Sequence, residues 1–247
     1  MNTNPLRILK IWLEGFLNIF FPLGCLGCGR QDQAICDNCL KNTKLLKNNK
    51  CPFCLITGSL GLVCKNCSGK YFLDGLFYVN YYEDNQFLTK AIWKLKFKGM
   101  VDYAQPLAKL LKRRLKLVYD CFSDLKNCYY CPIPSDFQKI KKRGFNQTQL
   151  LLNLMDINTD LQMKCLICQS GFKDQKTLDS KQRKIQIKNK FMVKTKLKGE
   201  KIILIDDIAT SLATLEEAAR VLKRAGAAKI YGLVLLRQKL RNINFKS

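Results

Sequence analysis

The stretch that most constrains the fold runs from Ile202 to Thr214 and reads IILIDDIATSLAT. It opens with four aliphatic residues, and an apolar run of this length is typical of a strand buried on both faces of a parallel sheet. Two carboxylates, Asp206 and Asp207, follow where that strand is expected to end. A helix pattern then runs from Thr214 to Gly226, so the unit predicts a strand, an acidic corner, a hydroxyl-rich turn and a helix.

This unit suits a ligand that carries both a phosphate and sugar hydroxyls. Open α/β sheets bind ligands at the carboxyl ends of their strands, and a turn that leads into a helix points backbone N–H groups at an anion. Two adjacent carboxylates suit sugar hydroxyls or a hydrated Mg²⁺. The alternative interpretation is a buried strand that merely ends in two acids before a capped helix.

Four Cys-x2-Cys pairs lie between residues 25 and 67. Two such pairs complete a tetrahedral four-thiolate zinc site, and a segment this short cannot bury enough core to fold without metal. A disulfide framework would need an oxidising compartment, and we recognise no export signal. We expect a cytoplasmic protein with two structural zinc sites, paired in chain order, with interleaved pairing as the alternative. The predicted ligands are Cys25, Cys28, Cys36, Cys39, Cys51, Cys54, Cys64 and Cys67.

The charge of the chain favours a polyanionic partner. It carries 43 Lys and Arg residues against 19 Asp and Glu residues and no His, for a formal net charge of +24. Such a balance is typical of proteins that bind nucleic acid. Codon bias toward Lys is the alternative explanation of this excess.

The N-terminal residues 1–21 predict a docking helix, with association at a membrane surface as the alternative. No stretch is apolar enough for a transmembrane helix. Residues 71–247 predict alternating strands and helices. The strands are expected at 76–82, 129–134, 202–205 and 227–236, and the helices at 85–98, 101–118, 147–154 and 214–226. We expect the tail, 237–247, to be frayed.

A second anion site is expected after the strand at 129–134, where a basic turn that contains Gly leads into a helix. A lysine-rich surface loop is the alternative. Five further cysteines are taken as free thiols, with a third metal site as the alternative: Cys121, Cys128, Cys131, Cys165 and Cys168. The residues predicted for the anion site are Arg143, Gly144, Asn146 and Gln147.

The stretch from Ile202 to Thr214 resembles the 5-phosphoribosyl-pyrophosphate motif of type I phosphoribosyltransferases. That resemblance implies that Asp206 and Asp207 contact the ribose hydroxyls as the catalytic pair. The chain departs from the motif at Leu212, where the loop usually carries Gly, because Gly permits positive φ and close approach to phosphate. The implied phosphoribosyl- and phosphate-binding residues are Ile208, Ala209, Thr210, Ser211, Leu212, Ala213 and Thr214.

Several stretches read together resemble the ComF family: the four cysteine pairs, Leu95 to Gly99, Pro132-x-Pro134, Arg143 to Gln147, and Ile202 to Thr214. Gln175-x2-Leu178 with Arg183 also resembles that family's stretch before its last core strands. That resemblance implies a type I phosphoribosyltransferase-like α/β domain over 71–247, a mostly parallel sheet flanked by helices. A double zinc ribbon over 22–70 would precede it. It also implies competence and DNA uptake, with handling of incoming single-stranded DNA in natural transformation. The segment 173–190 is placed like the loop that closes over the site in these transferases, with a disordered basic connector as the alternative.

Three functions stay open from the sequence. One is a binding module for single-stranded DNA whose pocket takes phosphoribosyl pyrophosphate or a nucleotide-like end. Another is an active Mg²⁺-dependent phosphoribosyltransferase of unknown acceptor, with Arg143 stabilising pyrophosphate. A scaffold for a competence helicase or uptake-machinery protein is a third. Candidate residues for base stacking are Tyr71, Phe72, Phe77, Tyr78, Tyr81 and Tyr82, with a place in the core or in a strand as the alternative for most of them.

Overall fold

The computed structural model describes residues 24–169 and 190–239. The chain divides into two compact units between Thr43 and Lys44. The described part of the first unit holds the first four cysteines and one short helix, α2 (Asp37–Asn42). The predicted N-terminal helix and residues 173–189 of the predicted closing loop lie outside the described residues, and the domain boundaries at 22 and 71 stay predictions.

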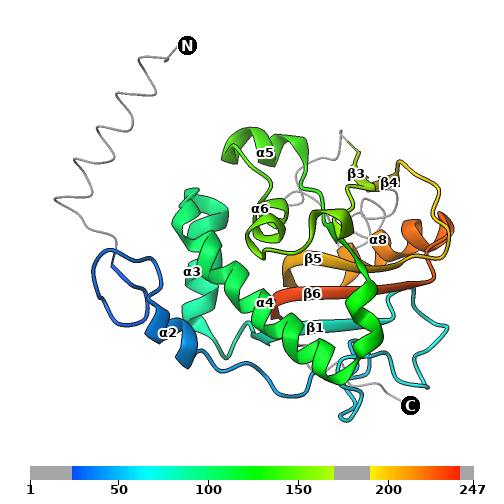
Figure 1. Ribbon diagram of the computed structural model, residues 1–247, viewed down its shortest axis with the longest axis horizontal. Helices are drawn as coiled ribbons and strands as arrows, with labels where there is room; N and C mark the ends of the chain where they lie inside the picture. The colour runs from blue at the N-terminus through cyan, green and yellow to red at the C-terminus, as the bar shows by residue number, and fades with distance from the viewer. Residues whose placement is uncertain (1–23, 170–189, 240–247) are drawn as a thin grey trace. The chain divides into compact units, whose positions relative to one another are not determined.

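The second unit is built on a four-stranded parallel sheet (Figure 1). Every neighbouring pair of strands in it is parallel, which confirms the predicted α/β class. A separate antiparallel pair joins β3 (Leu166–Cys168) and β4 (Phe191–Val193). The order of strands across the main sheet is β1 (Gly75–Tyr81), β6 (Lys229–Arg237), β5 (Lys201–Ala209) and β2 (Tyr129–Pro132).

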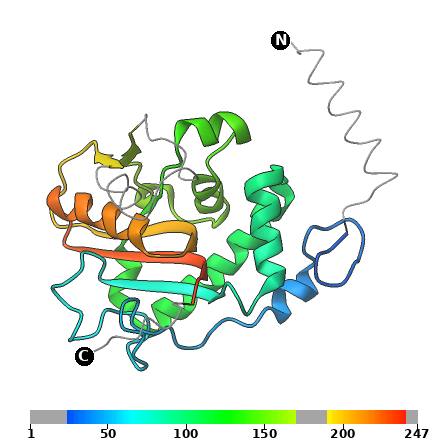
Figure 2. The ribbon, with the colours of Figure 1, turned by 180° about the vertical axis from the view of Figure 1, so that it is seen from behind.

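Helices cover both faces of this sheet. Figures 1 and 2 show α4 in front of the sheet from one side and α8 in front of it from the other. Short 3₁₀ turns lie at Val101–Tyr103, Ser123–Asn127 and Thr159–Leu161. The helices of this unit are α3 (Gln86–Lys98), α4 (Ala104–Cys121), α5 (Phe137–Arg143), α6 (Gln147–Leu154) and α8 (Ala213–Arg224). Within the described residues, none of the helices is both long and apolar enough to cross a bilayer.

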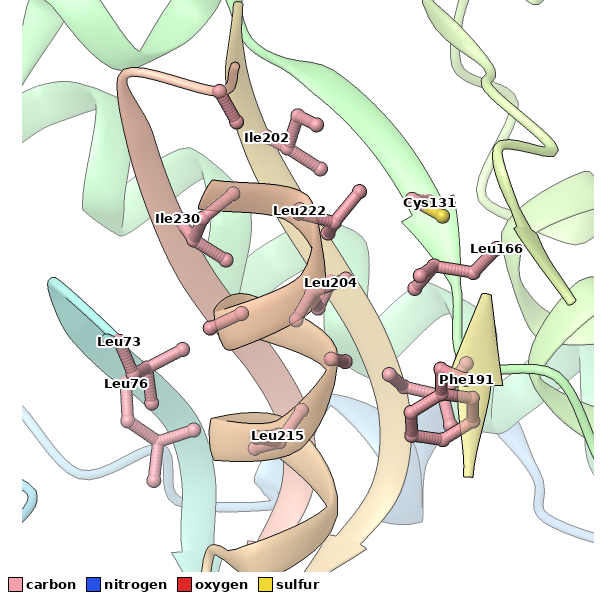
Figure 3. Close-up of a cluster of buried hydrophobic side chains, with 14 of the residues drawn as sticks. Leu73, Leu76, Cys131, Leu166, Phe191, Ile202, Leu204, Leu215, Leu222 and Ile230 are labelled. Atoms are coloured by element: carbon pink, nitrogen blue, oxygen red, sulfur yellow. The ribbon is translucent and has the colours of Figure 1, made fainter. Parts of the chain in front are cut away.

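The core between the sheet and α8 explains why β5 is so apolar. Residues 202–205 are fully buried, as expected for a central parallel strand with a covered layer on each face. Leu215 and Leu222 of α8 lie over Leu204 and Ile230 (Figure 3). A Cβ atom at Gly232 of β6 would lie 2.7 Å from a methyl of Leu76 and 3.2 Å from one of Leu215, so glycine permits this close packing.

Two expectations for individual elements were wrong. The helix expected at 101–118 begins with a 3₁₀ turn, and its α-helical part runs three residues later at each end, from Ala104 to Cys121. Arg237, which we placed in a frayed tail, is the buried last residue of β6. Its ladder partners on β1 and β5 extend the strand to this point.

Candidate functional site

The two acidic residues lie inside β5 rather than after its end. We expected the strand to stop at Ile205, but it continues to Ala209 because β6 supplies ladder partners as far as Arg237. Asp206 pairs with Val234 in that ladder. The carboxylates are therefore held by regular sheet backbone at the carboxyl end of the strand.

Asp207 is fixed by groups from two helices. Its carboxylate is 3% exposed and accepts hydrogen bonds from Lys96 Nζ (2.9 and 3.1 Å), Gln147 Nε2 (2.7 Å) and the Ile208 amide (2.7 Å). A buried carboxylate needs such partners, because an unpaired one costs several kcal/mol (order of magnitude). Asp207 therefore ties α3 and α6 to β5, and both of its oxygens already have protein donors.

Asp206 is in a different electrostatic state. It is only partly buried, and one of its oxygens accepts the Asp207 amide at 2.8 Å. Desolvation and the adjacent charge of Asp207 raise the pKa of Asp206 from 3.8 to about 7, although the cations of Lys96 and Lys190 oppose that rise. The two neighbouring carboxyl groups thus differ in their surroundings: Asp207 is held by several protein donors, and Asp206 can exchange a proton near neutral pH.

Of the four residues predicted for the anion site, two line the cavity and two have structural roles at helix ends. The basic turn expected there contains a helix, α5, whose N-cap is Asp136 and whose last residue is Arg143. Gly144 ends that helix with φ of 84°, and Asn146 caps α6 by accepting the Thr148 amide at 3.3 Å. Only the remaining two predicted residues face the site.

Arg143 and Gln147 extend the network around the diacid. The Arg143 guanidinium donates to the side-chain oxygen of Gln147, whose amide in turn donates to Asp207. Arg143 also lies over the ring of Phe97, 5.6 Å from its centroid. Desolvation lowers the pKa of Arg143, and the charge of Asp207 limits that fall. A guanidinium keeps its charge in proteins, so the site has a cation here.

The loop after β5 keeps a glycine-like backbone although it carries Leu212. This residue has φ of 63° and stands at the N-cap position of α8. A left-handed conformation costs a non-glycine residue roughly 1–2 kcal/mol. The Leu212 side chain is 5% exposed and belongs to the apolar core, which offsets that cost. Thr210 and Ser211 stay exposed, while Ile208 and Ala209 end the strand and Ala213 and Thr214 open the helix.

A buried arginine anchors the loop to the second group of cysteines. Arg237 donates to the carbonyl groups of Ala209 (3.2 Å) and Thr210. It also donates to the carbonyl of Pro52 at 3.5 Å, which lies between Cys51 and Cys54. Nothing in the local sequence signals this role, because the three carbonyl groups come from distant segments.

A cavity of about 490 Å³ gathers most of the predicted residues. Asp206, Asp207, Arg143, Gln147, Ile208, Thr210 and Thr214 line it. The loop from Ile208 to Leu215 surrounds a smaller recess of about 20 Å³ beside Asp206. Sequence reasoning did not assign several lining residues to this site: Trp93, Lys96, Phe97 and Lys139. Tyr82 and Lys190 also line it; the sequence offered Tyr82 for base stacking and Lys190 as the end of the closing segment. For the lining residues of α3, the signal in the sequence was the family-like stretch Leu95 to Gly99. That stretch does not show which side chains face the cavity.

The eight cysteines of the Cys-x2-Cys pairs form two clusters, each from consecutive pairs. Within each cluster all Sγ atoms lie within 4.8 Å of one another. The Cys28–Cys36 and Cys54–Cys64 sulfur distances are 3.6 and 3.4 Å, close to the edge of about 3.8 Å expected for a tetrahedron with Zn–S bonds of about 2.3 Å. The structure therefore has the pairing in chain order and fits a double zinc ribbon.

Backbone amides prepare some of these sulfurs as thiolates. Burial opposes ionisation of Cys25, but the amides of Cys36 (3.2 Å) and Gly27 (3.4 Å) outweigh it and lower its pKa to about 6. Interaction with Cys54 lowers the pKa of Cys64 to about 7. Thiolate is the form that binds zinc, so the donor chemistry fits a metal at each cluster.

The other cysteines belong to the α/β unit. Cys131 of β2 is buried in the core as expected, and its sulfur lies 3.5 Å from that of Cys165. Among residues 24–169 and 190–239, only the two clusters bring together three or more Cys, Asp or Glu ligand atoms. Burial raises the pKa of Cys128 to about 12, which keeps that thiol protonated.

A parallel sheet with a diacid at the end of β5, then a hydroxyl loop and α8, defines the phosphoribosyltransferase class of domain. Comparison with known families agrees: the phosphoribosyl transferase domain matches residues 106–243. The chain belongs to the ComF family of proteins with this domain. It is therefore related to the competence and DNA-utilization proteins.

Three relatives illustrate that membership. Competence protein ComFC of Bacillus subtilis (strain 168) is 27% identical over 84% of this chain and 86% of its own length. Competence protein ComFC of Streptococcus pneumoniae is 25% identical over 83% of this chain and 89% of its own length. DNA utilization protein YhgH of Escherichia coli (strain K12) is 26% identical over 58% of this chain and 64% of its own length.

Substitutions at Leu212 test whether burial offsets backbone strain. L212G and L212A both lose the buried side chain, but only Gly also relieves the positive φ. We expect the free energy of unfolding to fall by about 1 kcal/mol in L212G and by about 2–4 kcal/mol in L212A. Urea denaturation measures both, and L212A more stable than L212G would contradict the interpretation.

The raised pKa of Asp206 predicts a pH-dependent effect of D206N. A carboxyl group whose pKa rises on folding stabilises the protein below its unfolded pKa, and that contribution is lost as the pH rises through about 7. Asn cannot ionise, so D206N should be more stable than the parent at about pH 8, with a free energy of unfolding higher by at least about 1 kcal/mol. The difference in free energy should become smaller toward about pH 4. Urea denaturation across this range measures it; a constant difference would argue against the shift.

Proposed function

We propose that this chain handles single-stranded DNA in natural transformation, on the cytoplasmic side, and that its cavity holds phosphoribosyl pyrophosphate or a nucleotide-like ligand. The observation that carries the proposal is the cavity itself, where the diacid, the hydroxyl loop and several cations meet. The net charge of +24 supports a polyanionic partner. The printed names of the relatives, competence and DNA utilization, point the same way.

In this proposal the ligand lies along the cavity between the loop and α5. Its 5′-phosphate sits at the loop, where the hydroxyls of Thr210 and Thr214 and the backbone N–H groups at the start of α8 face it. Its ribose hydroxyls meet Asp206, the carboxylate whose oxygens are less occupied. Its pyrophosphate end lies near Arg143 and Lys139.

Asp207 acts in this arrangement mainly by position. Its carboxylate holds Lys96 and Gln147, and Gln147 in turn holds Arg143, so the cations stay where the ligand's charge falls. Mg²⁺ bound with the pyrophosphate would neutralise part of that charge when it is present. Of the two adjacent acids, Asp206 is the one that would face such an ion, because the oxygens of Asp207 already have protein donors.

An active phosphoribosyltransferase is the second candidate function. The observation that favours it is the backbone of Leu212, because the loop keeps the positive φ that glycine usually supplies, and the side chain turns into the core. Leu212 is absent from the residues that line the main cavity. Catalysis would consist of positioning and charge stabilisation of the leaving pyrophosphate by Arg143.

Calorimetric titration with phosphoribosyl pyrophosphate and Mg²⁺ tests the pocket. We expect D206N to weaken binding at least about tenfold, because a charge-assisted hydrogen bond to the ligand is lost. D160N, which changes an exposed carboxylate in the 3₁₀ turn at Thr159–Leu161, is the matched control and should leave the affinity unchanged.

Single-stranded DNA binding is then measured on the same protein by fluorescence anisotropy. Counterion release predicts an affinity that falls steeply as the salt concentration rises. Absence of binding to both ligands would contradict the proposed function and leave a scaffold for an uptake-machinery protein as the remaining interpretation. Pyrophosphate release with an added acceptor would support the transferase.

We propose that each cysteine cluster holds one structural Zn²⁺. The four ligands of a cluster leave no open coordination position, so the ion would stabilise the fold and take no part in a reaction. In the second cluster such an ion would also support Pro52, and through it the guanidinium of Arg237 that holds the loop.

The zinc proposal predicts a definite stoichiometry. Elemental analysis should find two equivalents in the parent and one in either C36S or C64S, because each substitution removes one of four thiolates from a single cluster. C121S changes an exposed cysteine of α4 and is the control that should retain both equivalents. Two equivalents retained in C36S would count against the assignment of that cluster.

A further inference from the structure

Two large aromatic side chains stand exposed on α3 at the cavity. Trp93 and Phe97 are 49% and 61% exposed, and their ring centroids are 6.0 Å apart. Both line the cavity together with Asp206. We call this pair of rings the aromatic shelf.

The core does not require these two rings. The buried residues of α3 are Leu88, Ala91, Ile92 and Leu95, and they form the face that packs inward. Trp93 and Phe97 add exposed apolar surface to the other side of the helix, which costs solubility without stabilising the fold. An aromatic pair left in that position, at the mouth of a cavity, indicates a ligand that covers it.

Cations surround the shelf on several sides. Lys98 Nζ lies 5.5 Å from the centroid of Trp93, and the Arg143 guanidinium lies 5.6 Å from that of Phe97. Lys139 and Lys190 line the same cavity. The pKa of Lys139 is lowered, first by desolvation and then by the nearby charges of Lys190, Arg143 and Lys96. The carboxylate of Asp136 opposes this shift. Flat apolar rings amid excess positive charge are complementary to bases joined by phosphates.

The residues we expected to stack bases are less suited to it. Phe77 and Tyr78 are buried in β1, and the ring of Tyr71 is stacked on Phe53 at 3.5 Å. Of that group, Tyr82 lines the cavity and is 39% exposed. The stacking surface at the cavity is therefore on α3 rather than on β1.

We propose that the aromatic shelf of Trp93 and Phe97 stacks a base of single-stranded DNA at the mouth of the ribose-phosphate cavity. Lys98, Lys139 and Arg143 hold the flanking phosphates. The inference rests on the proposed function, since it takes single-stranded DNA as the partner, and it adds where on the molecule the strand binds. Stacking is tolerant of sequence because every base has a π-face, so the shelf accepts any strand.

The sequence offers a direct spectroscopic test because it contains two tryptophans, Trp12 and Trp93. In W12F, Trp93 is the sole source of tryptophan fluorescence. Titration with oligothymidylate should quench that fluorescence saturably, at the same concentrations at which anisotropy reports binding. An abasic strand of equal length carries the same phosphates without bases and should leave Trp93 unquenched.

Matched variants separate stacking from charge and from folding. We expect W93A and F97A to weaken oligothymidylate binding about 5- to 100-fold, and W93F to retain it, because a second aromatic ring preserves the stack. L117A removes an exposed apolar side chain of α4 that does not line the cavity, and it should leave binding unchanged. Circular dichroism and zinc content establish that each variant is folded.

The outcomes separate this inference from the proposed function. Undiminished DNA binding in W93A and F97A, with no change in Trp93 fluorescence, would overturn the shelf and leave DNA handling intact. Equal quenching by the abasic strand would overturn stacking. Absence of DNA binding in the parent at low salt would remove the proposed DNA function together with the inference.

Discussion

The ion pair between Lys96 and Asp207 is the interaction on which the site depends. It joins α3 to β5 across the mouth of the sheet, at 2.9 Å and with the carboxylate nearly inaccessible to water. Gln147 brings α6 to the same carboxylate, and Arg143 follows through Gln147. Removing either charged partner would leave the other poorly paired in a desolvated place, which costs several times more than an exposed pair contributes.

The same network explains why two adjacent acids differ so strongly. Asp207 accepts hydrogen bonds from Lys96 and Gln147, so both of its oxygens have protein donors. Asp206 then stands beside a fixed negative charge with a single backbone donor, and its pKa rises to about 7. The two acids differ because only Asp207 bonds to side chains of α3 and α6. Asp206 lacks those donors, and its pKa is raised.

A second set of contacts holds the loop in which the chain departs from its family's motif. Leu212 adopts a left-handed backbone and hides its side chain in the core, while Arg237 binds the carbonyl groups of Ala209 and Thr210. The third acceptor of Arg237 belongs to Pro52 in the second cysteine cluster. The loop that faces the cavity is thus tied both to the sheet and to the segment that carries the second cysteine cluster. A disturbance of that cluster is therefore expected to reach the cavity.

Local patterns in the sequence were enough to predict the α/β class, the strand–diacid–helix unit and the two groups of four cysteines. A buried strand, an amphipathic helix and a Cys-x2-Cys turn are each encoded by residues close together in the chain. Only the tertiary structure decided that Asp207 is paired by Lys96, 111 residues away, and that Arg237 is buried at the end of β6. It also decided that Trp93 and Phe97 face the cavity, because the exposure of a helical residue depends on which face packs inward. Partners of this kind come from segments far apart in the chain, and no spacing rule in the sequence connects them.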